Sequence, residues 1–85
     1  MSDGGESDGA LRLKKLQWLA RRGMRELEIL IERFLLRERE ALNAGEWADL
    51  ESLLACEDDR LWDWFQGRLD DEAEPYQHLI NAIRR

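Results

Sequence analysis

Apolar residues recur along this chain at the spacing of an α-helix, three or four residues apart, and no stretch alternates as a β-strand does. The first stripe, which contains Leu13, Leu16 and Ala20, predicts a helix over about residues 10–22. A longer stripe predicts a second helix over about residues 25–44. Leucine, alanine, glutamate and arginine, all good helix formers, dominate, whereas threonine and valine are absent. The pattern therefore predicts an all-α fold.

Shorter apolar stripes continue through the second half of the chain. They predict a third helix over about residues 46–55 and a fifth that starts near Pro75. Between them, the acidic run 57–59 is expected to cap the start of a fourth helix that ends at Gly67. Residues 70–74, which contain four acids, are expected to form a solvated loop. Because these helices are short, tertiary packing must hold most of them in place. We therefore expect a compact five-helix bundle.

The length of 85 residues argues for a single domain. We assign this domain to residues 10–85 and interpret residues 1–9, which are polar, acidic and glycine-rich, as a disordered N-terminal tail. Gly23 is expected to let the backbone turn between the first two helices, and Gly45 to end the second helix.

Four tryptophans are unusual in so short a chain, and the pattern assigns them different positions. Trp47 and Trp64 fall on inward stripes and are expected in the core. Trp62 lies about 200° from Trp64 around the same helix, so the pattern leaves its exposure open. Trp18 lies off the first stripe, with a cationic residue one turn away on each side. This arrangement fits either a contact surface or a ring shielded by its cations.

The composition excludes several classes of function. One cysteine and one histidine cannot build a disulfide, a structural zinc site or a Cys–His catalytic pair within one chain. We see no catalytic constellation and no metal site, so we expect that the protein is not an enzyme. No stretch approaches the roughly 20 apolar residues of a membrane span, and the acidic N-terminus lacks the apolar region of a secretory signal. We expect a cytoplasmic protein.

Positive charge is concentrated in one segment of an otherwise acidic chain. The formal net charge is −6, yet residues 10–25 carry six cations and no acid. Such a segment can steer association with an acidic protein surface, or it can be an ordinary solvated helix face. It lacks a glycine loop and interleaved aromatic residues, so we expect no nucleic-acid partner.

The string Arg21-Arg22-Gly23-Met24-Arg25-Glu26 is the most informative in the chain. Basic residues at the end of one helix and an acid at the start of the next complement the two helix dipoles, which explains part of the string. A tight corner that displays guanidinium groups and a carboxylate is also suited to bidentate contacts with another protein. Both interpretations stay open on the residues alone.

The same residues resemble the signature of a known family. Residues 22–26 are similar to the Arg-Gly-x-x-Glu motif of the SdhE (YgfY) family, the succinate dehydrogenase assembly factors that promote covalent flavinylation. Trp18 stands four residues before Arg22, as in bacterial members. A second family stretch resembles Leu53-Leu54, Asp58, Leu61, Trp62 and Trp64-Phe65. The resemblance covers about residues 12–84.

This resemblance implies a five-helix bundle that binds the flavoprotein subunit of succinate dehydrogenase, and in bacteria also that of fumarate reductase. FAD is then the cofactor of the partner, which attaches it covalently, and this chain is expected to bind no cofactor stably. The family's contact positions fall on Lys15, Trp18, Arg22, Gly23 and Glu26, with Arg21 and Arg25 adjacent. We further expect a monomer, and the lack of a mitochondrial presequence favours a bacterial protein.

An alternative function stays open at this point. The same family has been described as the antitoxin half of a toxin–antitoxin pair. An antitoxin-like regulatory protein would need only a binding face, as an assembly factor does, so the sequence does not separate the two functions.

Overall fold

The computed structural model describes residues 8–85, and every regular element in this range is a helix. The elements are α1 (Asp8–Leu19), α2 (Arg25–Arg37), α3 (Arg39–Asn43), α4 (Leu50–Leu54), α5 (Asp58–Phe65), the 3₁₀ helix η1 (Asp71–Tyr76) and α6 (Gln77–Arg84). The all-α prediction is confirmed, but the predicted count of five helices is wrong, because six α-helices occur in the described residues. Of the predicted tail, residues 1–7 lie outside the described residues, and its last two residues belong to α1.

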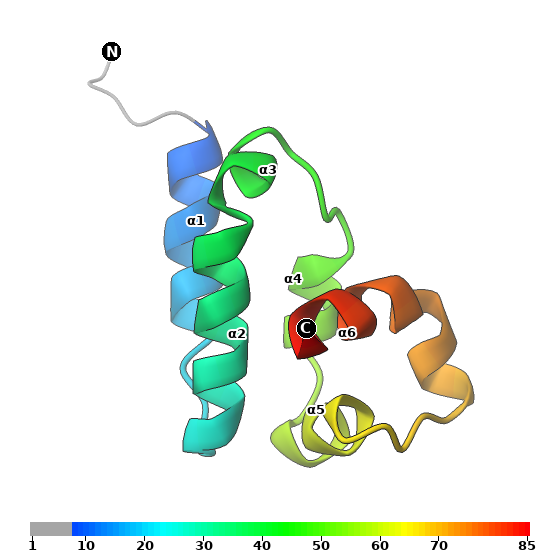
Figure 1. The fold of residues 1–85 in the computed structure, drawn as a ribbon. Helices are drawn as coiled ribbons and strands as arrows, with labels where there is room; N and C mark the ends of the chain where they lie inside the picture. Colours follow the sequence, from blue (N-terminus) through cyan, green and yellow to red (C-terminus); the bar gives the residue numbers. More distant parts are fainter. Residues whose placement is uncertain (1–7) are drawn as a thin grey trace.

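The helices lie in two layers, as Figure 1 shows. α1 and α2 run antiparallel, side by side, and α3 turns back across the end of this pair to pack against α1. α4, α5 and α6 form the other layer, in which α6 packs against both α2 and α5. The turn from α1 to α2 therefore lies at one end of the two-helix layer, close to α5.

A hydrophobic cluster fills the space between the two layers. Leu16 and Ala20 contribute to it from the first layer, and Trp64 is the largest fully buried side chain from the second. The prediction that Trp64 belongs to the core is confirmed. Trp47, also expected in the core, is only half-buried at the edge of the cluster, and Trp62 has the same partial exposure.

The predicted helix over residues 25–44 is interrupted at Glu38. The backbone of Glu38 leaves the helical region, with φ −103° and ψ 21°, between the end of α2 and the start of α3. Its carboxylate accepts a hydrogen bond from Nε1 of Trp47 at 3.1 Å. Trp47 has a left-handed backbone, φ 58°, and its ring lies edge-on to Phe34 and stacked on His78. The bend therefore gives the Trp47 indole a hydrogen-bond acceptor at the edge of the core.

The other predicted boundaries differ more modestly. α1 ends at Leu19 instead of Arg22, and the predicted helix over residues 46–55 is regular only in α4. The predicted acidic loop is instead the 3₁₀ helix η1, because the Asp70 carboxylate accepts the Ala73 N–H at 3.1 Å and starts a turn. Pro75 lies inside η1, so α6 begins after it.

Two of the predicted glycine stops are confirmed. Gly45 has φ 88° and Gly67 has φ 96°, a conformation that favours glycine after a helix end. The chain turns at Gly23 as predicted, but without the positive φ that favours glycine. The turn between α1 and α2 therefore depends on something other than the conformational freedom of glycine.

None of the helices in residues 8–85 is long and apolar enough to cross a membrane.

Candidate partner-binding site

The corner between α1 and α2, residues 20–24, is held by two carboxylates. The backbone N–H of Arg22 donates to Glu28 Oε2 at 2.8 Å, and the backbone N–H of Gly23 donates to Asp58 Oδ2 at 3.0 Å. Glu28 belongs to α2 and Asp58 to α5. These two bonds, one to α2 and one to α5, fix the turn at the corner.

The side chain of Arg22 points into the domain and is only 11% exposed. Its Nε donates to Asp58 Oδ1 at 2.7 Å, and its Nη1 donates to the carbonyl oxygens of Leu19 at 2.9 Å and Leu54 at 2.7 Å. Its Nη2 donates to the carbonyl oxygen of Cys56 at 2.5 Å. A guanidinium is suited to this position because it offers several donors in one plane to the open carbonyl ends of α1 and α4.

Asp58 has a different role from the one that the sequence suggested. The acidic run 57–59 was expected to cap the fourth helix, but α5 has no side-chain cap. The Asp58 carboxylate instead binds the corner. The hydrogen bond from Arg22, together with the Gly23 N–H, holds the pKa of Asp58 below its usual value, so the carboxylate keeps its charge to a lower pH than a free aspartate does.

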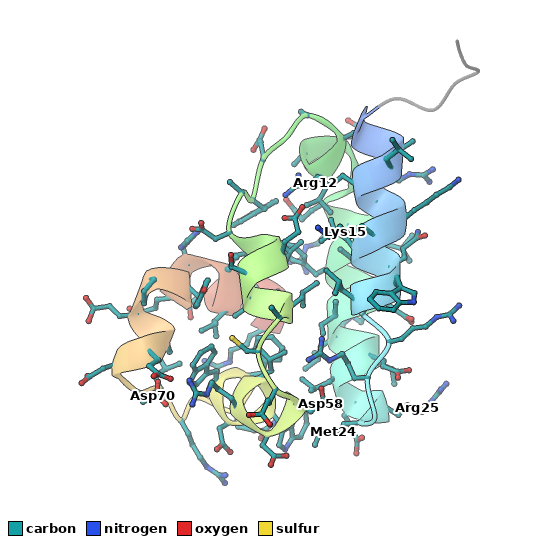
Figure 2. All side chains as sticks on the ribbon, turned by 180° about the vertical axis from the view of Figure 1, so that it is seen from behind. Arg12, Lys15, Met24, Arg25, Asp58 and Asp70 are labelled. Carbon is teal, nitrogen blue, oxygen red and sulfur yellow. The ribbon has the colours of Figure 1, made fainter. Side chains whose placement is uncertain are left out.

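Arg12 forms a second clamp near the other end of α1. It donates to both oxygens of the Glu51 carboxylate, at 3.1 and 3.3 Å, and to the carbonyl oxygens of Leu42, Glu46 and Trp47 at 2.7–2.8 Å. The Arg12 hydrogen bond lowers the pKa of Glu51. Figure 2 labels Arg12 and Asp58 near opposite ends of α1. Two of the six cations in residues 10–25 are therefore paired inside the domain.

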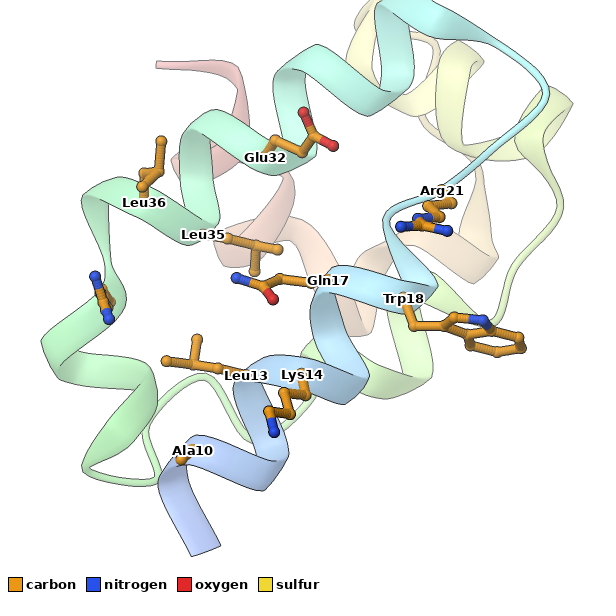
Figure 3. Close-up of a pocket in the computed structure, with 10 residues that line it drawn as sticks. Ala10, Leu13, Lys14, Gln17, Trp18, Arg21, Glu32, Leu35 and Leu36 are labelled. Atoms are coloured by element: carbon orange, nitrogen blue, oxygen red, sulfur yellow. The ribbon is translucent and has the colours of Figure 1, made fainter. Parts of the chain in front are cut away.

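The remaining predicted site residues are exposed. They are Lys15, Trp18, Arg21, Gly23, Arg25 and Glu26. Trp18 is 70% exposed, and Figure 3 shows its ring at the corner end of α1 and pointing away from α2. Arg25 points outward at the start of α2 (Figure 2). Within residues 8–85 the Arg21, Arg25 and Glu26 side chains have no ion pair or hydrogen bond. The structure thus groups Trp18, Arg21, Gly23, Arg25 and Glu26 at one exposed end and turns Arg22 inward. It places Lys15 further along α1, where its charge helps to lower the pKa of Glu51.

Residue 23 has room for a side chain in the isolated domain. A Cβ added at Gly23 would meet only the Asp58 Oδ2 atom, at 3.6 Å, which is an ordinary contact distance. Since φ is also unstrained here, neither the backbone nor the packing of the described residues requires glycine at this position.

A groove of about 760 Å³ runs between α1 and α2 and begins beside the corner (Figure 3). Leu13, Leu35 and Leu36 give it an apolar surface, and Trp18 and Arg21 line its corner end. Leu36 is 74% exposed, and no role was expected for it from the sequence. Its position off the apolar stripe of the second helix is the signal that marks it as exposed.

The described residues contain no group of three or more histidine, cysteine or acidic side chains placed to bind a metal ion. The Cys56 thiol lies near the carbonyl oxygen of Ser52, and the His78 ring is stacked on Trp47.

Comparison with known proteins identifies relatives over most of the chain. A FAD assembly factor SdhE of Xylella fastidiosa (strain 9a5c) is 38% identical over 77 residues, which are 91% of this chain and 79% of the relative. The protein of the same name from Coxiella burnetii is 36% identical over 75 residues, 88% of this chain and 92% of the relative. That from Pseudomonas aeruginosa is 35% identical over 71 residues, 84% of each chain. No solved structure gives a significant match.

The family comparison agrees with these relatives, and the names of the relatives give no support to the antitoxin alternative. Residues 14–85 match the model of the Sdh5 family, which is described as the flavinator of succinate dehydrogenase. The match includes the whole corner and both helices that flank it, apart from the first residues of α1. The resemblance drawn from residues 22–26 is thereby confirmed, and the chain belongs to the Sdh5 family of flavinators of succinate dehydrogenase.

Proposed function

We propose that this protein binds the flavoprotein subunit of succinate dehydrogenase and promotes the covalent attachment of FAD to it. The observation that carries the proposal is the corner at Gly23, which is fixed from inside by Asp58 and open on its outer side. The fold itself does not require glycine there. A glycine is therefore best explained by a partner surface that comes close to the backbone at this point.

The exposed residues around Gly23 have the chemistry of a protein contact. Trp18 offers a large, rigid, exposed ring, the residue type that most often contributes strongly to binding energy. Lys15, Arg21 and Arg25 place positive charge beside it, which favours an acidic partner surface and speeds association with it. Figure 2 shows Arg25 beside the corner, at the start of α2, and Lys15 further along α1, near Arg12.

The protein acts on its partner by binding, without chemistry of its own. It binds the conformation of the flavoprotein in which FAD attachment proceeds, and so shifts the partner's population towards that state. FAD stays with the partner, and no cofactor is bound stably here. The flavoprotein of fumarate reductase is a second partner, and the protein acts as a monomer in the bacterial cytoplasm.

The test is in-gel flavin fluorescence of the flavoprotein subunit expressed with and without this protein. The wild-type chain is expected to increase the covalent fluorescence, and Gly23→Arg to abolish the increase while keeping the helical circular dichroism. Ala48→Arg, which adds the same side chain at an exposed position outside the corner, is the matched control and should behave as wild type.

Equal fluorescence with and without the wild-type chain contradicts the proposed function. A folded Gly23→Arg protein with full activity contradicts the assignment of the corner as the contact site.

A further inference from the structure

Asp58 lies outside the set of contact residues, yet it holds two parts of the corner at once. Its Oδ1 accepts from the Nε of Arg22 at 2.7 Å, and its Oδ2 accepts from the backbone N–H of Gly23 at 3.0 Å. It reaches the corner from the first turn of α5, 35 residues along the chain from Gly23. The carboxylate therefore links the exposed corner to the second layer of helices.

Both oxygens of the carboxylate are needed for this arrangement. Each accepts a different N–H, one from the Arg22 side chain and one from the Gly23 backbone. An asparagine in place of Asp58 has one acceptor oxygen and one NH₂ group, which is only a donor. It would therefore place a donor against either Arg22 or Gly23 and lose one of the two bonds.

The inward position of Arg22 extends this link to the end of α4. Because its guanidinium also binds the carbonyl oxygens of Leu54 and Cys56, it is not available to a partner in this conformation. Arg22 and Asp58 together connect the corner, the end of α4 and the start of α5.

We propose that Asp58 is a positioning residue for partner binding, which holds the backbone at residues 22–24 in its binding shape before the partner arrives. A corner that is already ordered avoids the entropy cost of ordering on association, and this raises affinity without a direct contact. The inference rests on the proposed function, since it concerns affinity for the flavoprotein subunit. It adds a residue that acts through Arg22 and Gly23.

The chain offers a matched control for a purely structural role. Glu51 accepts a forked pair of hydrogen bonds from Arg12, as Asp58 accepts one from Arg22, but near the opposite end of α1. The two carboxylates have almost the same exposure, 30% for Glu51 and 29% for Asp58. Glu51→Gln and Asp58→Asn therefore remove comparable clamps, and only the second touches the corner.

Two measurements test the inference, both at a temperature where urea titration shows the variants to be folded. Calorimetry with the purified flavoprotein subunit should show that Asp58→Asn weakens affinity by about tenfold or more, while Glu51→Gln stays within about twofold of wild type. Hydrogen exchange followed by NMR should show faster exchange of the Gly23 amide in Asp58→Asn and unchanged exchange in Glu51→Gln. If the two carboxylates only stabilised the fold, Asp58→Asn and Glu51→Gln would have similar effects on affinity and on exchange of the Gly23 amide.

A second variant covers the case in which Asp58→Asn does not fold. Asp58→Glu keeps the negative charge beside Arg22, but its longer side chain misplaces the oxygen that accepts the Gly23 N–H. It should weaken affinity by about threefold or more with stability largely retained.

The outcomes are distinguishable from failure of the proposed function. No binding by the wild-type chain overturns the proposed function and this inference together. If the wild-type chain binds normally, two results would overturn this inference alone. One is a folded Asp58 variant that binds within about twofold of wild type, and the other is a Glu51→Gln variant that weakens binding as much as the Asp58 variant does.

Discussion

Replacement of Arg12 by alanine should be one of the most damaging single changes to the stability of this domain. The substitution removes the donors to three backbone carbonyl groups and to the Glu51 carboxylate. A hydrogen bond from a charged group contributes about 1.5–3 kcal/mol, but bonds from one side chain are not additive, and the freed carbonyl groups regain some water. We expect a net loss of about 3 kcal/mol in the free energy of unfolding.

This loss is large enough to measure by simple unfolding experiments. For a domain of this length, about 3 kcal/mol corresponds to a fall in Tm of about 12–24 °C. Urea titration followed by circular dichroism gives the free energy directly. Arg12→Lys should recover at most about half of the loss, because an ammonium group is a single point of donors and cannot reach the carboxylate and the carbonyl groups together.

Arg33→Ala is the matched control for this experiment. Arg33 lies on α2, and its exposed side chain has no hydrogen bond or ion pair within residues 8–85. Both substitutions exchange a helical arginine for alanine, so the small change in helix propensity is the same in the two variants. Arg33→Ala should change stability by less than about 0.5 kcal/mol. A loss of less than about 1 kcal/mol in Arg12→Ala would refute the clamp described here.

Four further substitutions test other features of the structure. Because the pKa of Glu51 is lowered in the fold, its charged form stabilises the domain fully above the unfolded pKa of about 4.3, and this contribution is lost as pH falls below that value. Glu51→Gln should therefore make the free energy of unfolding depend less on pH between pH 7 and 3, as measured by urea titration. Gly45→Ala should cost about 1 kcal/mol in the same titration at pH 7, because φ there is 88°; an unchanged value would contradict that conformation. Trp64→Leu should cost about 2–4 kcal/mol, whereas Trp18→Ala should leave stability within about 0.5 kcal/mol and weaken binding to the flavoprotein subunit instead.

The helix pattern could be predicted because it is local. Apolar spacing alone defines the inward faces of α1, α2, α5 and α6, and the glycine stops at Gly45 and Gly67 depend only on residues next to them. The interruption at Glu38 could not be predicted in this way. The Glu38 carboxylate there accepts a hydrogen bond from an indole nine residues further along the chain, and no periodic pattern contains that contact.

The site was predicted as a set of residues but not as an arrangement. The string at residues 21–26 suggested exposed charges at a corner, and Trp18 was left open between a contact surface and a ring shielded by its cations; its 70% exposure fits the contact surface. The inward turn of Arg22 was missed, because its acceptors are carbonyl groups that only the folded chain brings together. For the same reason Asp58 was interpreted as a helix cap, although its carboxylate is bound to a corner from the other half of the sequence.

The two arginine clamps have a mechanical consequence for the way this protein meets a partner. With a single ion pair, α1 could still rotate about that contact relative to the second layer. Two ion pairs, Arg12–Glu51 and Arg22–Asp58, lie near the two ends of the helix. Together they oppose both rotation and sliding of α1 against the second layer. The exposed end with Trp18 is then part of one stiff body, so docking should be a rigid-body event with little rearrangement of this chain. Conformational adjustment during complex formation would have to come from the larger partner.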